Sequence, residues 1–189
     1  MKVQKLTIQK MHPVKNKTAG TVPFLIRKAT LRDLSGIMNI MTEAADDRKH
    51  PDWFVADDES YVRQHISDKG YTVVAQTADD KIAGFFIVKY PDLDDNLGNY
   101  LGMNEEALRQ VAVMDSAVVG RIYRGAGLQG RMLEAAEEFL DKNRFHYLMC
   151  TIHPDNRFSR YNMESHGYEV KKVTQCYGGL DRCILIKKC

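Results

Sequence analysis

A glycine-rich turn is the sequence feature that most constrains the fold of this chain. The run RGAGLQGR (residues 124–131) follows the β-branched segment Val111–Val119 and precedes apolar residues that recur at helical spacing. Glycines let a backbone curl with its N–H groups pointing inward, and the start of a helix adds positive potential. The pattern predicts a strand, a turn and a helix that together hold an anionic diphosphate. A tight connection that uses glycine for geometry alone is the alternative.

Two nucleotide-binding motifs fit this turn poorly. Gly125, Gly127 and Gly130 satisfy G-x-G-x-x-G, but residues 120–124 separate the first glycine from the strand, and few strands could follow. A dinucleotide-binding fold is therefore disfavoured. The phosphate loop of ATPases requires Lys and then Ser or Thr where this chain has Arg131 and Met132, so ATP hydrolysis is not supported.

The rest of the chain alternates between strand and helix signals. Thr30, followed by Asp33 three residues later, resembles the cap that begins a helix, and Gly167 predicts the end of the last one. Strands are predicted over 24–29, 71–75, 82–89, 111–119, 147–152, 168–173 and 182–187. Helices are predicted from Thr30 to about 45, over 58–66, from Gly127 to about 143, and after a cap at Asp155 and Asn156. The polar segment 91–104 is predicted to be the longest loop. This order implies a mixed α/β fold around one largely antiparallel sheet.

Composition bounds the class of protein. The chain has 189 residues, 44% of them hydrophobic, and a formal net charge of +2, which suits one folded domain with a sizeable core. Its longest apolar run, 82–88, is far short of the roughly 20 residues of a membrane-spanning helix. The four cysteines form no C-x-x-C pair and the six histidines no H-E-x-x-H, so no metal is expected. Reduced thiols in the cytoplasm are the expectation.

The first 22 residues differ from the remainder because they contain five lysines and no acid. They are predicted to form a basic arm or an extra strand ahead of a domain over 23–189. No apolar core or cleavage site of a signal peptide is present in them. A nucleic-acid-binding arm is disfavoured because no aromatic residue is interleaved with the lysines.

Two motifs together resemble the GNAT superfamily of acetyl-CoA-dependent N-acetyltransferases. Arg124 and Gly127 fit its signature R/Q-x-x-G-x-G/A after a strand, with Gln129 where Gly or Ala is usual. Asn156 and Ser159, followed by Gly167 and Tyr168, resemble its N-x-x-A/S and terminal G-F/Y. The resemblance covers roughly residues 24–188, and it implies a single-domain fold with splayed central strands.

The resemblance also implies which residues bind acetyl-CoA. The strand before the turn would pair with pantetheine through Ala117, Val118 and Val119. The turn would cradle pyrophosphate through Arg124, Gly125, Ala126, Gly127, Leu128 and Gln129, with Gly130 at the helix start. In the last helix, Asn156 would contact pantetheine, and Ser159 and Arg160 would lie near the pyrophosphate or the adenosine.

The implied reaction moves an acetyl group directly from the thioester to an amine, which needs a neutral nucleophile and a proton for the thiolate. Asp115 is the first candidate for the base, with a polar substrate-binding or strand-capping role as the alternative. His153 is the second candidate, and a turn residue is its alternative. The family's usual tyrosine is replaced by Met163, so water, a displaced tyrosine or no acid at all are the options. Tyr161 is expected to point elsewhere.

The sequence therefore predicts a cytoplasmic GNAT-type acyltransferase whose partners are acetyl-CoA and a primary amine, on a small molecule, an amino acid or a protein. No nucleic-acid or membrane partner is expected, and a homodimer through an exposed strand or the arm is one option. The rival hypothesis is a sensor or interaction module that binds acetyl-CoA but has little or no activity. Met163 is its main support. Aromatic residues such as Trp53 and Tyr100, and the turn at 177–179, are candidates to line the acceptor pocket.

Overall fold

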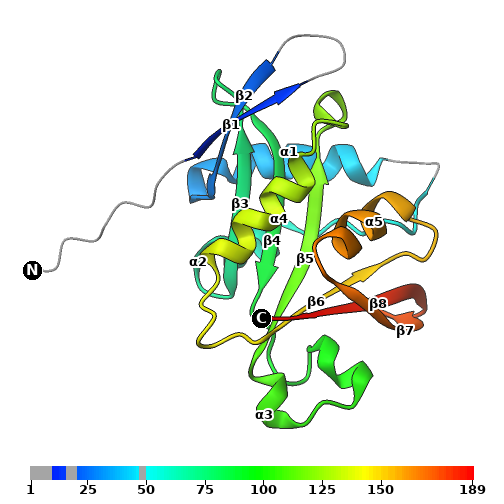
Figure 1. Ribbon diagram of the computed structural model, residues 1–189. Helices are drawn as coiled ribbons and strands as arrows, with labels where there is room; N and C mark the ends of the chain where they lie inside the picture. The colour runs from blue at the N-terminus through cyan, green and yellow to red at the C-terminus, as the bar shows by residue number, and fades with distance from the viewer. Residues whose placement is uncertain (1–9, 16–20, 47–49) are drawn as a thin grey trace, which may run out of the picture.

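The computed structural model describes residues 10–15, 21–46 and 50–189, and its centre is one eight-stranded sheet (Figure 1). The strand order is β1-β2-β3-β4-β5-β6-β8-β7. The strands are β1 (Lys10–Lys15), β2 (Thr21–Lys28), β3 (Gly70–Gln76), β4 (Ile82–Lys89), β5 (Val111–Val119), β6 (Tyr147–Ile152), β7 (Glu169–Cys176) and β8 (Leu180–Lys188). Among these strands, β5 and β6 form the one parallel pair and the other neighbours are antiparallel. The predicted mixed, largely antiparallel fold is confirmed.

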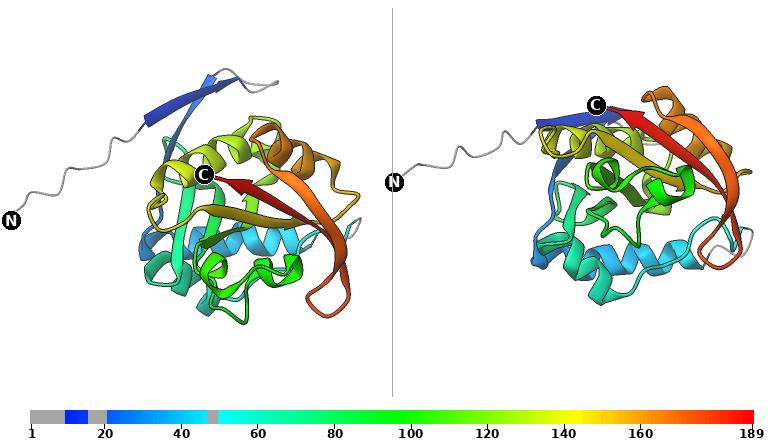
Figure 2. Two further views of the ribbon diagram at one scale, coloured as in Figure 1. Left: turned by 60° about the horizontal axis from the view of Figure 1, so that its bottom comes forward. Right: turned by 90° about the horizontal axis from the view of Figure 1, so that it is seen from below.

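Five α-helices and three short 3-10 helices connect the described strands. The α-helices are α1 (Leu34–Ala45), α2 (Glu59–Ser67), α3 (Glu105–Leu108), α4 (Leu128–Phe139) and α5 (Arg157–Ser165). The 3-10 helices are η1 (Leu31–Asp33), η2 (Leu97–Leu101) and η3 (Arg121–Tyr123). Figure 2 shows α1 and α2 on one side of the sheet and α4 on the other. Each face is closed by its own apolar cluster, with Ile37 and Phe85 fully buried on the α1 side and Met132 and Leu133 on the α4 side.

The helix starts follow from local hydrogen bonding. The Asp33 carboxylate accepts hydrogen bonds from the Thr30 backbone N–H at 2.7 Å and from its hydroxyl at 3.1 Å, as the cap signal predicted. Asp58 caps α2 by accepting from the Tyr61 N–H at 2.8 Å, and Asn156 caps α5 by accepting from the Ser159 N–H at 3.1 Å. These side chains satisfy N–H groups that have no partner within the helix.

The structure corrects three predicted boundaries. The helix predicted to reach residue 143 ends at Phe139, because Leu140 turns to an extended backbone conformation and its side chain is buried. The predicted loop 91–104 contains η2, which begins where the Asn96 side chain accepts from the Gly98 N–H at 2.9 Å. The first predicted strand begins at Thr21 rather than 24 and pairs with β1.

The two central strands separate along their length. β5 pairs with β6 only where Val111–Val113 oppose Tyr147–Met149, and beyond that point the two strands diverge (Figure 1). The second half of β5 therefore keeps β4 on one side and has lost β6 on the other. Backbone groups that would pair with β6 in a closed sheet instead face the opening between the strands, as the resemblance implied.

Candidate functional site

The glycine turn lies at the end of β5 and leads into α4. Gly125 has φ 81° and Gly127 has φ 70°, in the left-handed region that favours glycine. Gly127 is the N-cap of α4, and the first helical bond runs from the Arg131 N–H to its carbonyl at 3.3 Å. A Cβ atom added at Gly125 or Gly127 would meet no described atom within 4 Å. The turn is therefore open on the side where a ligand would approach the N–H groups of the first turn.

The end of β5 offers backbone groups to the same opening. The Gly120 N–H donates to the Ala83 carbonyl of β4 at 2.9 Å, and alternate residues of a strand direct their backbone groups to opposite sides. The groups of Ala117 and Val119 therefore face the opening, whereas those of Val118 face β4. Arg124, the first residue of the turn, donates from Nε to the Val119 carbonyl at 3.3 Å. Of the three predicted strand residues, two direct their backbone groups toward the opening between β5 and β6.

The last helix brings its predicted residues to the same place. Gln129 Nε2 on α4 donates to Ser159 Oγ on α5 at 3.3 Å, so the two motifs are in contact. Asn156 uses Oδ1 to cap α5, which leaves its amide group to donate elsewhere. Arg160 instead pairs with Glu164 at 2.9 Å, one turn further along the exposed face of the same helix.

Gly130 has a packing reason to be glycine. A Cβ there would lie 3.0 Å from Oδ1 of Asn162 on α5 and 3.2 Å from Cε1 of His166, the residue that follows α5. The missing side chain lets the first turn of α4 approach α5 closely. Its position in the G-x-G-x-x-G pattern is therefore explained by helix packing, while its N–H still belongs to the open first turn.

A β-bulge in β5 shapes the other half of the opening. Ala117 opposes Phe86 and Met114 opposes Val88, so Asp115 and Ser116 together oppose one residue of β4. Consecutive strand side chains normally point to opposite faces. Here Tyr61 Oη donates to Asp115 Oδ2 at 2.5 Å, and Ser116 Oγ donates to Asp57 Oδ2 at 2.8 Å. The bulge thus directs both side chains toward the beginning of α2.

Electrostatics distinguish this acidic group from an ordinary surface. Burial raises the pKa of the Asp115 carboxyl, and the Tyr61 hydrogen bond and Lys89 oppose that rise. Burial and the neighbouring charge of Asp115 raise the pKa of Asp57, which Ser116 opposes. A carboxylate whose pKa is raised toward neutrality binds protons more readily, which suits a general base.

His153 lies at the end of β6 and holds a turn. Its Nδ1 accepts from the Asp155 N–H at 3.2 Å, so the lone pair of this nitrogen is already engaged in the turn. The Trp53 ring stacks on His50 at 3.7 Å between centroids and lies 6.1 Å from the His153 ring. The geometry thus favours Asp115 over His153 as the proton acceptor.

Aromatic side chains complete this end of the opening. Tyr177, in the turn between β7 and β8, has φ 52°, and its hydroxyl lies 3.1 Å from Thr151 Oγ1 of β6. Burial raises the pKa of Tyr177 to about 12, which keeps the phenol protonated at neutral pH. Arg182, 4% exposed, donates to the Asp52 carbonyl at 2.8 Å and so fixes the loop that carries Trp53.

The position of the family's usual tyrosine is part of the core. Met163 is 3% exposed and packs in the cluster under α4, whereas Tyr161 is 74% exposed, as the helical spacing predicted. Helix α5 therefore presents no hydroxyl from either residue to the apolar interior. Residue 163 therefore offers no proton donor, and the exposed Tyr161 does not replace it.

Sequence reasoning missed the residues that hold the bulge. Tyr61 and Asp57 lie 54 and 59 positions before their partners Asp115 and Ser116, and no local pattern connects them. Their spacing of four residues across the start of a predicted helix was the one available signal. Glu43, late in α1, accepts from the Arg121 N–H at 3.0 Å and so anchors η3.

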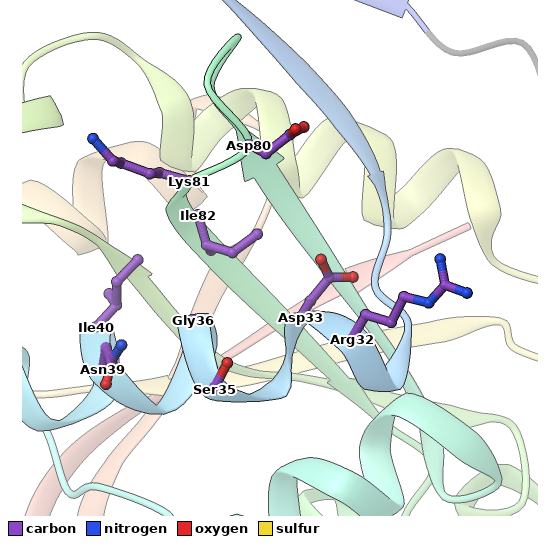
Figure 3. A pocket seen from close by; sticks show the side chains of 9 residues that line it. All are labelled: Arg32, Asp33, Ser35, Gly36, Asn39, Ile40, Asp80, Lys81 and Ile82. Carbon is purple, nitrogen blue, oxygen red and sulfur yellow. The ribbon is translucent and has the colours of Figure 1, made fainter.

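A second hollow, of about 280 Å³, lies between α1 and the turn before β4 (Figure 3). Two of its four charged side chains form ion pairs, because Asp33 binds Arg27 at 2.7 Å and Lys81 binds Asp79 at 2.8 Å. Within residues 10–15, 21–46 and 50–189, no group of three or more His, Cys, Asp or Glu side chains is placed to hold a metal ion. The same residues contain no helix long and apolar enough to cross a membrane.

A parted pair of parallel strands, with a glycine turn after one of them and a half-buried carboxylate on that strand, is the arrangement that the resemblance to acetyl-CoA-dependent transferases implied. A sequence profile described as "Acetyltransferase (GNAT) family" matches residues 36–168. The chain belongs to this family and is an acyltransferase of the kind that uses acetyl-CoA. No curated protein matches the sequence closely enough to count as a relative.

Solved structures agree on the fold. A GNAT acetyltransferase from Listeria monocytogenes aligns with TM-score 0.67 and 19% identity, over 91% of this chain and 98% of its own. A ribosomal-protein-alanine N-acetyltransferase from Brucella melitensis aligns with TM-score 0.66 and 22% identity, over 87% and 99%. A phosphinothricin acetyltransferase from Sinorhizobium meliloti, in complex with AcCoA, aligns with TM-score 0.67 and 17% identity, over 87% and 88%.

Proposed function

We propose that this protein is an N-acetyltransferase that moves an acetyl group from acetyl-CoA directly to a primary amine. The observation that carries the proposal is the placement of Asp115 on β5, the strand that precedes the open glycine turn, four residues before the end of that strand at Val119. The acceptor would be a small amine, an amino acid or a protein amine. The Brucella protein is a ribosomal-protein-alanine N-acetyltransferase and the Sinorhizobium protein is a phosphinothricin acetyltransferase, and the first of these supports an amine acceptor here.

We call the end of β5, the glycine turn and the starts of α4 and α5 the cofactor half of the opening, and its residues fit an acyl-CoA. When bound, acetyl-CoA supplies an acetyl group activated as a thioester. The N–H groups around Gly127 would bind the pyrophosphate, because the turn is open and lies at a helix start. Ala117 and Val119 would pair with the pantetheine arm, and Arg124 would release the Val119 carbonyl to do so. Asn156, Ser159 and Arg160 would contact the pantetheine or the nucleotide from α5.

The acceptor half of the opening contains Asp115, His153 and the side chains around them. Its residues would remove a proton from the incoming amine. An amine arrives mostly as an ammonium at neutral pH and cannot attack until it loses a proton. Asp115 would accept that proton at a carboxylate oxygen, directly or through a water molecule. His153 is the second candidate and would first have to give up its hydrogen bond from the Asp155 N–H.

A protein that binds acetyl-CoA without turnover is the second candidate function. Met163 favours it, because a buried methionine replaces the family's usual proton donor. The protonated phenol of Tyr177 favours an enzyme, because it places a hydroxyl near the same opening. The two candidates differ in one observable, the release of free thiol.

The proposed setting is the cytoplasm, with neither nucleic acid nor membrane as a partner. The domain would span 23–189, and the described part of the segment 1–22 would extend it, while residues 1–9 and 16–20 lie outside the described residues. Strand β1 supports that extension, because it continues the sheet beyond β2 at an edge that could also pair with a second copy.

The proposal is tested by thermal unfolding with acetyl-CoA, NAD or ATP, followed by a thiol-release assay. A ligand that binds only the folded protein raises its stability. We expect acetyl-CoA alone to raise the melting temperature, and thiol release with at least one of putrescine, glycine, tyramine or a peptide with a free N-terminus. Stabilisation without release from a broad amine panel would favour the binding module. Stabilisation by NAD, or by none of the three, would contradict the acyl-CoA site.

A further inference from the structure

The start of α2 is attached to both residues of the bulge in β5. Asp57, just before the helix, accepts from Ser116 Oγ at 2.8 Å, and Tyr61, one turn later, donates to Asp115 Oδ2 at 2.5 Å. Asp57 directly precedes the N-cap Asp58, and Tyr61 lies in the first turn of α2, so both contacts with the bulge come from the start of this helix. A short helix far away in sequence thus fixes the direction of the candidate base.

The Tyr61 side chain packs against the ring of His65. The His65 ring lies 4.0 Å from the Tyr61 ring, between centroids, and its Nδ1 donates to the Tyr61 carbonyl at 2.8 Å. His65 is 3% exposed, and burial lowers its pKa, so the ring stays neutral. Packing against this ring restricts the rotamers of Tyr61 and keeps its hydroxyl directed at Asp115.

Several titratable groups face the Asp115 carboxylate from different elements. Tyr61 and Asp57 come from the α2 side, Lys89 from β4 and Tyr177 from the turn between β7 and β8. Asp95 approaches from the loop after β4 and forms an ion pair with Lys89. That pairing weakens the effect of Lys89, so Tyr61 is the direct hydrogen-bond donor on which the carboxylate depends.

We propose that Tyr61 is a positioning residue that holds one oxygen of the ionised Asp115 carboxylate and leaves the other oxygen to face the acceptor amine. This inference rests on the proposed function, in which Asp115 accepts the proton. A hydroxyl that donates to a carboxylate stabilises the ionised form more than the protonated form. Tyr61 therefore counteracts the burial of Asp115, and its loss makes the carboxylate bind a proton at higher pH.

The test is a pH titration of the Asp115 carboxyl in Tyr61→Phe and in the parent protein, monitored by NMR. The aspartate carboxyl carbons are labelled with carbon-13, and the Asp115 signal is identified by its absence in Asp115→Asn. A hydrogen bond to a charged group corresponds to about one pH unit or more. We expect the Asp115 midpoint to rise by about one unit. In the pH profile of kcat/KM for the amine that is turned over, the midpoint of the acidic limb should move to higher pH by the same amount. Activity should then recover at higher pH.

Tyr71→Phe is the matched control. It removes a buried tyrosine hydroxyl that donates to the Ala136 carbonyl at 2.5 Å on the opposite face of the sheet. This control should leave the Asp115 midpoint and the pH profile unchanged. An unchanged Asp115 midpoint in Tyr61→Phe would overturn the positioning role. Unchanged turnover in Asp115→Asn would instead overturn the role of Asp115 in the proposed function, so the two failures are distinguishable.

Discussion

The two halves of the opening between β5 and β6 are built in different ways. The cofactor half consists of backbone N–H groups of one continuous segment, from the end of β5 into α4, and its glycines leave the approach open. The acceptor half is assembled from side chains of separate elements, as the bonds of Asp115 to Tyr61 and of Ser116 to Asp57 illustrate. One local segment forms the proposed acetyl-CoA site, whereas contacts between residues far apart in the sequence form the proposed acceptor site.

The difference extends to charge. The cofactor half offers helix-start dipoles and Arg124 to an anion. The acceptor half contains two carboxylates whose pKa values burial raises, Asp57 and Asp115. We therefore expect substitutions in one half to change acetyl-CoA affinity and substitutions in the other half to change turnover.

The largest expected effect is that of Asp115→Asn on turnover. An amide cannot accept the proton, and general bases contribute about 100-fold or more. We expect kcat/KM at pH 7 to fall by about 100-fold in a thiol-release assay. In the parent protein the rate should fall as pH drops through the Asp115 pKa, which burial places above its ordinary value, because only the ionised form acts. If Asp115→Asn kept the pH profile of the parent protein, the general base would be His153 or water rather than Asp115.

Gly127→Asn should weaken acetyl-CoA binding by about tenfold or more, equivalent to about 1.4 kcal/mol. Asparagine tolerates the left-handed conformation at φ 70°, but its side chain enters the open space that the pyrophosphate needs. The matched control is Gly102→Asn, at φ 66° beyond η2, also with nothing within 4 Å of an added Cβ. Calorimetric titration should show weaker binding in the first variant alone, and equal affinities in both would contradict the cradle.

Gly130→Ala should lower the free energy of unfolding by about 1 to 3 kcal/mol, a typical cost of overpacking. The new Cβ would lie 3.0 Å from Asn162 Oδ1, although alanine is the better helix former. Urea denaturation measures the change. A more stable variant would show that α4 and α5 move apart easily and that close packing does not explain this glycine.

The smallest expected effect is that of Asp92→Asn on KM for the amine. Asp92 lies with Asp94 and Asp95 in the loop after β4. Asp92 pairs with Lys69 at 3.2 Å, with side chains 80% and 47% exposed, and such surface pairs contribute about 0 to 1 kcal/mol. Its charge is already matched, so KM for putrescine or another turned-over amine should change by less than about twofold. A large rise in KM would show that this loop attracts a cationic acceptor.

The sequence predicted what local rules control. The end of α1 at Ala45, the limits of β5 and the cap at Asn156 follow from periodicity and capping, and each matches the structure. The end of α4 was predicted four residues late, because burial of Leu140 overrides its helical periodicity. The acceptor half was predicted only as single residues, since nothing local shows that a bulge turns Asp115 and Ser116 toward α2.

The division between the halves is tested most directly by the acetyl-CoA dissociation constant of Asp115→Asn, measured by calorimetry on the same preparation that is used for turnover. We expect the dissociation constant to stay within about twofold of the parent value while thiol release falls by about 100-fold. A variant that loses acetyl-CoA affinity along with turnover, or that keeps both, would contradict the separation of cofactor binding from proton transfer.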